Sequence, residues 1–421
     1  MNSQPIVIDR REHGIDRSQV LPAALKVIDG LQNAGFHACV VGGGVRDLLL
    51  GLKPKDFDVA TDATPEEIRK VFRSARLIGR RFRLAHVRFG REIIEVATFR
   101  GQAGGESDTE HSNGRILRDN TFGSEAEDAV RRDFTINALM YDPVTEVVKD
   151  YVGGYEDLKS RTLRLIGDPV TRYREDPVRL LRATRFAVKL DLKLEPATAG
   201  PIPQMAGLLS DIPPARLFEE VLKLLMAGHA WPTFRQLVQF GLWEALFPNL
   251  FEDPSRPGEL VEQALKNTDD RVRGGQPVTP AFLFAALLWP RVRVKAVLLE
   301  KEGIPIVEAY SEAGEIVLAE QVRTVAIPRR FSGMSKQIWM FQPRFMKMRG
   351  KRVLGLMSER RFRAAYDFLL LRALEEPELE PVAEWWTQIQ ELTTEERNQK
   401  IFGRKRKPGG RRRQQAGSGP A

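Results

Sequence analysis

Residues 38–60 read ACVVGGGVRDLLLGLKPKDFDVA, and the rest of the chain is best interpreted from this run. The short apolar segment Ala38–Val41 predicts a buried strand. The three glycines that follow allow the backbone to turn sharply and to approach a ligand closely. Val45–Leu50 predicts a short helix that ends at Gly51, and Lys55–Ala60 predicts a second strand. The sequence therefore predicts a strand, a glycine turn, a short helix and a strand, in that order.

Two aspartates stand out on the second of these strands. Asp56 and Asp58 should share one face because side chains alternate along a strand, while Phe57 and Val59 point to the other face. Neighbouring carboxylates repel each other, so the pair favours a bound cation, and all-oxygen ligands suit Mg²⁺. An Asp-x-Asp pair alone is often just solvated, and a glycine triplet alone is usually a loop. Their order and spacing together favour a metal-dependent site.

A third carboxylate is expected close to this pair. The strand predicted over Arg91–Phe99 carries Glu95 among apolar neighbours, where a charge without a partner is costly. If that strand lies beside the aspartate strand, Glu95 completes a cluster that can hold two metal ions. The alternative for Glu95 is an ion pair with an arginine such as Arg46 or Arg100.

A charged segment, Arg131–Asn137, falls within a helix predicted over Ala126–Leu139. Asp133 and Asn137 are four residues apart, so one helical face would present both. Two adjacent arginines, Arg131 and Arg132, suit bidentate phosphate binding. Asp133 is placed either to reach the site or to orient one of these arginines. A solvated helix face is the alternative, and it is the preferred interpretation for Arg131 taken alone.

The segment 172–186 forms the other dense group of charges. Pro177 at the first helical position makes Asp176 the expected N-cap, which is a structural role. Three arginines then recur at a spacing of three residues: Arg179, Arg182 and Arg185. A carboxylate and an arginine one turn apart offer an acceptor and donors to the edge of a base. Farther along, Arg216 and Glu220 are expected to brace this helix.

Composition limits the class of protein. The formal net charge of the 421 residues is +9, and the segment from Lys400 to Arg413 carries eight basic residues and no acidic one. The tail should therefore be disordered and favour polyphosphate. The single cysteine, Cys39, fits a reducing compartment and a small core position. No secretory segment or bilayer-length apolar stretch is present in the sequence given, so a cytoplasmic location is expected. The basic residues predicted to bind RNA are Arg404, Lys405, Arg406, Lys407, Arg411, Arg412 and Arg413.

The predicted fold class is α+β, with a mixed sheet and helices followed by an all-α region. Residues up to Ser18 resemble a polar extension, and helices are predicted over Val20–Ala34 and Pro65–Phe72. Gly101–Asn120 is predicted to be a mobile loop, and no convincing strand follows Asp168. The predicted domains are a head at 1–160, a helical neck at 161–230, a helical body that binds RNA at 231–400 and a disordered basic tail at 401–421.

Together these motifs resemble the class II nucleotidyltransferases, the family of tRNA CCA-adding enzymes and bacterial poly(A) polymerases, from Ala38 to about Leu225. The resemblance implies that Asp56 and Asp58 bind the metal ions. It leaves open whether Glu95 or Asp133 is the remaining catalytic carboxylate, with Glu95 also a candidate metal ligand. It implies nucleotide-binding roles for Gly42, Gly43, Arg46, Asp47, Arg131, Arg132, Asn137, Asp176 and Arg179. Arg100, Arg182 and Arg185 are further predicted nucleotide-binding residues.

Within that family, several segments resemble the poly(A) polymerase branch. They include GRRFRLAHV at 79–87, the third glycine Gly44, and IEVATFR at 94–100. Further matches are KNTD at 266–269 with PAFLFAA at 280–286, and FRAAYD at 362–367. The C-terminal half lacks the phosphohydrolase-type His-Asp pair that some long CCA-adding enzymes carry. The resemblance therefore favours polyadenylation over CCA addition.

The predicted function is template-independent transfer of AMP from ATP to RNA 3′ ends, with release of pyrophosphate and promotion of RNA turnover. The expected cofactors are two Mg²⁺ ions, with Mn²⁺ as an alternative. A CCA- or A-adding tRNA nucleotidyltransferase is the main rival, and CTP incorporation would distinguish it. A non-enzymatic RNA-binding protein is disfavoured because Asp56, Asp58 and Glu95 are all present. RNA and ATP are the expected partners, and no motif identifies a protein partner.

Overall fold

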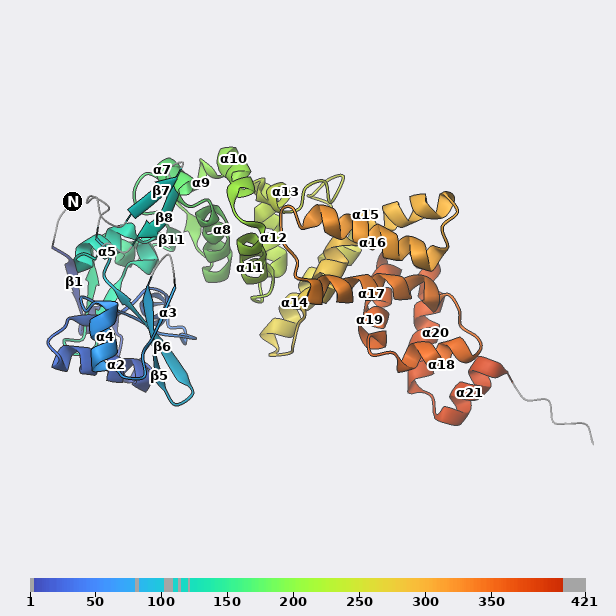
Figure 1. Cartoon of the computed structure of the whole chain (residues 1–421), viewed down its shortest axis with the longest axis horizontal. Coiled ribbons are helices and arrows are strands. Elements are labelled where there is room, and N and C mark those ends of the chain that lie inside the picture. The colour runs from blue at the N-terminus through green and yellow to red at the C-terminus, as the bar shows by residue number, and fades with distance from the viewer. Residues whose placement is uncertain (1–3, 80–82, 102–108, 113–114, 120–121, 404–421) are drawn as a thin grey trace, which may run out of the picture. The chain divides into compact units, whose positions relative to one another are not determined.

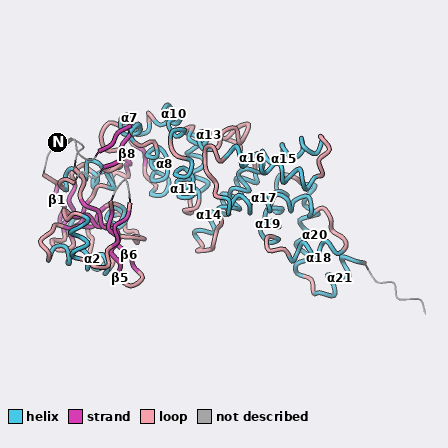
Figure 2. The backbone as a smooth tube through the Cα atoms, viewed as in Figure 1, coloured by secondary structure: helices cyan, strands magenta, loops and turns pink. Residues whose placement is uncertain are grey.

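The chain forms two compact units in a computed structural model that describes residues 4–79, 83–101, 109–112, 115–119 and 122–403. The first unit contains Met1–Leu224 and Pro232–Leu246, and the second contains Leu225–Trp231 and Phe247–Ala421. Every strand in the described ranges belongs to the first unit, whereas the described part of the second unit is helical (Figures 1 and 2).

A mixed eight-stranded sheet organises the first unit. Only β3 and β6 are parallel neighbours in it, and the other adjacent strands are antiparallel. In spatial order the strands are β1 (Ile6–Asp9), β10 (Val147–Asp150), β9 (Met140–Asp142), β2 (Ala38–Val41), β3 (Asp58–Thr61), β6 (Glu92–Thr98), β5 (Leu84–Phe89) and β4 (Arg76–Ile78). Two-stranded sheets are formed by β7 (Thr109–Ser112) with β8 (Arg115–Asp119) and by β11 (Thr162–Leu163) with β12 (Lys193–Leu194).

Helix α2 (Pro22–Asn33) covers the middle of the sheet, where it contacts β2, β3 and β6. It begins with Pro22 in the first turn, and its apolar stripe is fully buried at Ala24, Val27, Ile28 and Leu31. The other helices of the head are α1 (Arg10–His13), α3 (Gly43–Leu49), α4 (Pro65–Val71), α5 (Glu125–Arg131) and α6 (Gly154–Lys159), with 3₁₀ turns η1 (Arg17–Gln19) and η2 (Thr135–Asn137).

Apart from β12, the described elements after residue 168 are helices. In the first unit they are α7 (Pro169–Glu175), α8 (Val178–Leu190), α9 (Pro196–Ala199), α10 (Ile202–Met205), α11 (Pro214–Leu225), α12 (Ala230–Gln239) and α13 (Leu242–Leu246), with η3 (Ala206–Asp211). The last residue of α11 and the first two of α12 fall in the second unit. No helix within the described ranges combines the length and apolar character that a bilayer crossing requires.

The second unit is a set of packed helices with an aromatic core. Trp386 donates its indole N–H to the carbonyl of Phe345 at 2.8 Å, and the two rings meet edge to face. The helices are α14 (Glu259–Arg273), α15 (Pro280–Lys301), α16 (Ile306–Gln321), α17 (Arg329–Phe345), α18 (Lys351–Ser358), α19 (Phe362–Glu375), α20 (Glu380–Glu391) and α21 (Thr394–Phe402), with η4 (Pro377–Leu379).

The predicted α+β class is confirmed, but four local predictions are wrong. Residues 4–18 are not a polar extension, because β1 pairs with β10 at the edge of the sheet. The described parts of Gly101–Asn120 form the β7–β8 hairpin, and β12 is a strand beyond residue 168. The helix predicted over Ala126–Leu139 ends at Arg131 because Arg132 is extended and Phe134 forms a β-bridge with Leu165.

Candidate active site

The glycine turn brings α3 close to the aspartate segment. Gly42 has φ of 71°, a conformation that other residues adopt at a cost. A Cβ on Gly44 would lie 3.1 Å from Cδ1 of Phe57 and 3.5 Å from the carbonyl oxygen of Asp56. Without a side chain at Gly44, α3 packs directly against the segment that carries the predicted metal ligands.

The sheet register places Glu95 next to Asp58. Asp58 begins β3 and pairs with Val41 of β2 on one side and with Glu95 of β6 on the other. Directly paired residues project from the same face of a sheet. The condition under which Glu95 joins the two aspartates, that its strand lies beside theirs, is therefore met. Asp56 lies just before β3 rather than within the predicted strand.

Charge repulsion is concentrated at Asp58. Burial, followed by the charges of Glu95 and Asp56, raises its pKa to about 6, and Arg132 opposes this shift. Asp58 nevertheless keeps an exposed surface, so solvent screens part of the repulsion. An acidic side chain whose proton affinity is raised in this way fits a divalent cation, because a cation replaces the proton as the neutralising charge.

Glu95 has a histidine as its partner rather than an arginine. Nε2 of His86 on β5 lies 3.2 Å from Oε1 of Glu95, and the two residues are directly paired across the strands. Arg46, one of the predicted alternatives, is buried and donates to Asp47 at 2.8 and 2.6 Å and to Asn137 at 2.6 Å. His86 is a site residue that the sequence interpretation missed.

A continuous polar network connects the glycine turn with the helix α8. Arg46 donates to Oδ1 of Asn137, and Nδ2 of Asn137 donates to Oδ1 of Asp133 at 3.1 Å. Oδ2 of Asp133 accepts from Nε of Arg182 at 2.7 Å. Because Asn137 lies on the turn η2 rather than on a helix, its contact with Asp133 does not come from helical spacing.

Both carboxylate oxygens of Asp133 accept hydrogen bonds within this network. Burial raises its pKa, but Arg182, Asn137 and the Phe134 amide outweigh burial, so the pKa is lowered. Both of its oxygens therefore already accept hydrogen bonds from protein groups. These contacts suit a residue that positions Arg182, and the catalytic role predicted for Asp133 stays a prediction.

The predicted phosphate-binding arginines differ in their surroundings. Arg132 donates to Asp128 at 3.0 and 2.8 Å, and its Nη1 lies 3.3 Å from where a Cβ on Gly42 would be. Arg131 donates to the carbonyl of Gly101, and the Arg100 amide donates to Asp128 at 3.2 Å. Arg132 is thus the member of this group that borders the glycine turn. The sequence interpretation gave no role to Arg172. This residue holds the C-terminal end of α5 by donating to the carbonyls of Arg131 and Arg132 at 2.9 and 2.6 Å.

Asp176 and Arg179, the two residues predicted to read the base, bond other residues rather than each other. Asp176 accepts from Arg216 on α11 at 2.9 Å, which confirms the Arg216 part of the predicted brace, whereas Glu220 accepts from Lys223 at 2.7 Å. Arg179 instead bonds Glu175 at 2.9 Å. Asp176 follows the last residue of α7 as its C-cap, and Pro177 rather than Asp176 is the N-cap of α8. The Val178 amide donates to Asp176 over a long distance of 3.4 Å.

Arg185 lies deeper in the first unit than the sequence suggested. Its guanidinium stacks on the Phe186 ring at 4.8 Å, and its Nε is buried without a partner among the described residues. Burial, followed by the charge of Arg182, lowers its pKa. A partly buried guanidinium whose Nε has no partner among the described residues suits an anionic ligand. The tail residues predicted to bind RNA lie outside the described residues.

A second cluster of potential ligands lies at the other end of β2. Among the described residues, one group of possible metal ligands has its ligand atoms within 4.8 Å of one another. Its members are His37, Cys39 and Glu125. Lys149 bonds Glu125 at 2.9 Å and Tyr151 bonds it at 2.8 Å. Although burial opposes the shift, the bonds from His37, Lys149 and Tyr151 lower the pKa of Glu125 to about 2. An ammonium group already neutralises this cluster, so it is a satisfied network.

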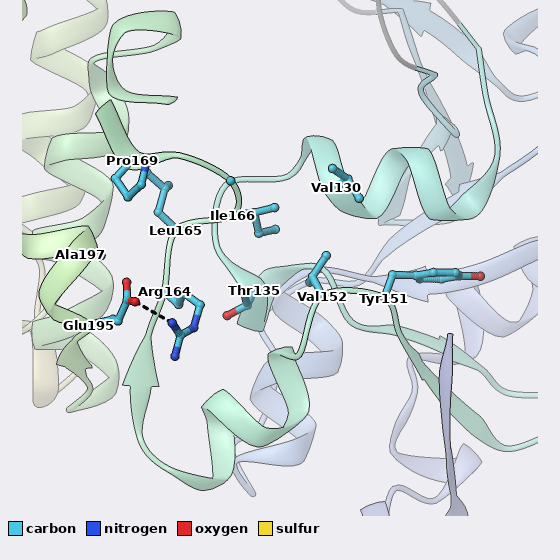
Figure 3. A pocket seen from close by; sticks show the side chains of 11 residues that line it. Val130, Thr135, Tyr151, Val152, Arg164, Leu165, Ile166, Pro169, Glu195 and Ala197 are labelled. Atoms are coloured by element: carbon cyan, nitrogen blue, oxygen red, sulfur yellow. Dashed lines mark hydrogen bonds and ion pairs between the residues drawn. The ribbon is translucent and has the colours of Figure 1, made fainter. Parts of the chain in front are cut away.

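A hollow of about 430 Å³ lies elsewhere in the first unit (Figure 3). Its walls include Val130, Thr135, Ile166 and Pro169, and Arg164 at its rim donates to Glu195 at 2.6 Å. None of the predicted site residues lines it. Arg164, the cation of this lining, is already paired with Asp157 and Glu195, so the hollow does not suit a triphosphate.

Known proteins resemble this chain over most of its length. Residues 38–164 match the Poly A polymerase head domain, residues 191–253 the probable RNA and SrmB-binding site of polymerase A, and residues 302–418 the polymerase A arginine-rich C-terminus. Poly(A) polymerase I of Salmonella typhi is 52% identical over 397 residues, which cover 91% of this chain and 85% of that protein. A CCA-adding enzyme of Lactobacillus helveticus is 38% identical over 213 residues, or 50% of this chain and 52% of that protein.

A solved structure agrees with the fold. The Thermotoga maritima CCA-adding enzyme complexed with tRNA superposes with a TM-score of 0.61 at 21% identity, covering 92% of this chain and 87% of that chain. A glycine turn that delivers two aspartates to a strand beside a third acid is the head of a nucleotidyltransferase, and the protein is an enzyme of that class. Its place within the class follows from the identity over nine tenths of its length: the chain belongs to the bacterial poly(A) polymerase family.

Proposed function

We propose that this enzyme adds AMP from ATP to the 3′ ends of RNA without a template and releases pyrophosphate. The observation that carries the proposal is the in-register pairing of Asp58 with Glu95, next to a glycine turn and a helix that presents base-reading groups. Named relatives at 52% identity support the choice of ATP and RNA as substrates. Because both substrates are cytoplasmic, we propose that the enzyme works in the cytoplasm.

Two Mg²⁺ ions are the proposed cofactors, and Asp56, Asp58 and Glu95 are the residues that would hold them. The donor set is all oxygen, as Mg²⁺ requires, and the raised pKa of Asp58 indicates an uncompensated negative charge. When bound, such ions lower the pKa of the RNA 3′-hydroxyl and neutralise charge on the phosphates. His86 would orient Glu95 through its 3.2 Å contact.

The nucleotide would lie along α8. At the start of that helix, Asp176 offers an acceptor and Arg179 offers donors to an adenine edge. Farther along, Arg182 and Arg185 face the network of Asp133 and Arg46. Arg132 and the amides of the glycine turn are placed to bind the triphosphate. The chain's own residues thus bind and orient the nucleotide from base to phosphates.

RNA would contact the second unit as well as the tail. We define the α17–α19 basic surface as Arg344, Lys347, Arg349, Lys351, Arg352, Arg360, Arg361 and Arg363. Glu359 is the one acidic residue between its ends, and two hollows of about 480 and 820 Å³ share Lys347 and Arg352 as lining residues. Such a density of cations favours a phosphate backbone through counterion release.

Incubation of the protein with a generic RNA, Mg²⁺ and each nucleoside triphosphate in turn tests the proposed function. The expected product is a long homopolymer formed with ATP alone. Asp58→Ala should abolish adenylation and leave RNA binding largely intact, because the metal ligands and the basic surface belong to different units. Unchanged adenylation by Asp58→Ala would remove the mechanism.

A CCA-adding activity is the second candidate. The Lactobacillus helveticus relative favours it, since that protein is named a CCA-adding enzyme and matches half of this chain. Stepwise incorporation of CTP into a tRNA that lacks its 3′ end would replace the first proposal with this one. The identity to poly(A) polymerase I is higher and covers more of the chain, which favours adenylation.

A further inference from the structure

Lys189 extends the row of cations on α8 beyond the arginines already discussed. It follows Arg182 by seven residues and Arg185 by four, so all three lie along one side of the helix. Lys189 is exposed and has no hydrogen-bond or ion-pair partner in the part of the chain that the structure describes. A lysine at a helix C-terminus has an ordinary explanation in the helix dipole, so its surroundings must decide its role.

Those surroundings bring Lys189 near the residues proposed to bind the metal ions. The charged groups that act on its ammonium come from three elements: Arg46 and Asp47 on α3, Arg185 on α8, and Asp56 before β3. Partial burial lowers the pKa of Lys189, and Arg46 and Arg185 lower it further, whereas Asp47 and Asp56 raise it. The Arg46–Asp47 pair is internally neutral. If metal ions neutralise Asp56, Lys189 and Arg185 remain as uncompensated positive charges.

The length of α8 indicates which part of the nucleotide reaches Lys189. Arg179 and Lys189 are ten residues apart, and a rise of 1.5 Å per residue separates them by roughly 15 Å along the helix axis. That separation is comparable to the extent of a stretched-out nucleoside triphosphate. If the base is read near Arg179, the far end of the same helix meets the outer phosphates.

We propose that Lys189 binds the β- and γ-phosphates of the incoming nucleoside triphosphate and holds the pyrophosphate before it leaves. The inference rests on the proposed function, because it takes the base to be read near Arg179. The RNA backbone carries the same phosphate chemistry, but a contact with RNA would act on a different substrate and is separated by the test below.

The test compares Lys189→Gln, Lys189→Arg and the control Lys193→Gln, an exposed lysine on β12. Lys189→Gln should raise both the KM for ATP and the inhibition constant of pyrophosphate about tenfold, because one charged hydrogen bond is lost. Inhibition by AMP, which lacks these phosphates, and the Kd for RNA should not change. Lys189→Arg should retain most of the pyrophosphate affinity, and Lys193→Gln should match the wild type.

Two outcomes would overturn the proposal. An unchanged inhibition constant for pyrophosphate would show that Lys189 is a surface lysine, and weaker RNA binding alone would assign it to the RNA backbone. Direct titration of pyrophosphate in the presence of Mg²⁺ gives the same comparison without turnover. If the wild type binds pyrophosphate but does not adenylate RNA, the proposed function fails while the role of Lys189 is still tested.

Discussion

Asp58 on β3 is the direct neighbour of Glu95 on β6, across the parallel pair of the eight-stranded sheet. Helix α4 and strands β4 and β5 separate these residues along the chain. The fold thus brings together two acidic residues from distant segments on interior strands of the sheet, and burial together with their repulsion raises the pKa of Asp58.

The first prediction concerns the pH dependence of metal-free stability. The pKa of Asp58 rises from 3.8 to about 6 on folding, so the folded state binds its proton more tightly than the unfolded state. The cost of ionising Asp58, which comes from burial and then from the charges of Glu95 and Asp56, is therefore absent below pH 3.8, and the free energy of unfolding falls as the pH rises to about 6. Because Asp58 is exposed, screening should limit this loss to about 1 kcal/mol or less.

Asp58→Asn should remove this pH dependence, and Mg²⁺ should reduce it in the wild type. Urea unfolding from pH 4 to pH 7, with and without a chelator, measures both effects. Glu92→Gln, an exposed carboxylate at the start of β6, is the matched control. An identical stability profile for Asp58→Asn and the wild type would contradict the assignment of the repulsion to this residue.

A second prediction tests the close packing at Gly44. In Gly44→Ala the new methyl group would lie 3.1 Å from the Phe57 ring, so the aspartate segment must shift by a few tenths of an ångström. We expect a stability loss of about 1 kcal/mol and a fall in kcat of at least tenfold, because metal ligands tolerate little displacement. The double variant Gly44→Ala/Phe57→Leu should recover part of the activity. No recovery, with Phe57→Leu itself active, would mean that the glycine acts in another way.

The third prediction concerns base selection. Arg216 holds Asp176 through a 2.9 Å ion pair, so Arg216→Ala should free the acceptor that we propose reads the base. The ratio of kcat/KM for ATP to that for CTP should fall about tenfold, mainly through ATP. Arg235→Ala, which removes an exposed arginine of α12, is the control. Equal losses with both nucleotides would indicate that Arg216 stabilises the helices without affecting selection.

The fourth prediction separates the two basic regions. Ending the chain at Gly403 removes seven basic residues of the tail and leaves α21 intact. The slope of log K for RNA against log salt should flatten by about 0.7 for each lost phosphate contact. Lys347→Gln/Arg349→Gln/Arg352→Gln should flatten it independently, whereas Lys301→Gln should not. If the slope survives the truncation, the tail does not contact RNA.

The sequence was most informative where the signal is local. Thr64 and Glu67 form the capping box that begins α4 next to Pro65, and the strand, turn and helix around the glycines follow from a few adjacent residues. The helix predicted beyond Arg131 is wrong because the β-bridge from Phe134 to Leu165 is a tertiary contact. Local propensity contains no information about such a partner.

Partners across the fold were predicted less well. The position of Glu95 beside Asp58 was stated as a condition, since strand adjacency is decided by packing. The alternative that paired Glu95 with an arginine was wrong. Its partner is His86, which faces it through the β5–β6 register. Asp133 was read as a helix-face residue, whereas its pairing with Arg182 depends on how α8 packs against the turn. Sequence periodicity gives the face of an element but not its neighbour.

The edge strand β1 has a practical consequence for anyone shortening this protein. The match to the head domain begins at residue 38, yet β1 and α2 lie before it and belong to the same sheet and core. A fragment cut at Ala38 would leave β10 as an open edge that can pair with other chains. It would also uncover the surface now shielded by Val27, Ile28 and Leu31. Such a fragment should precipitate during expression, so the first cut that preserves a soluble head lies upstream of Ile6.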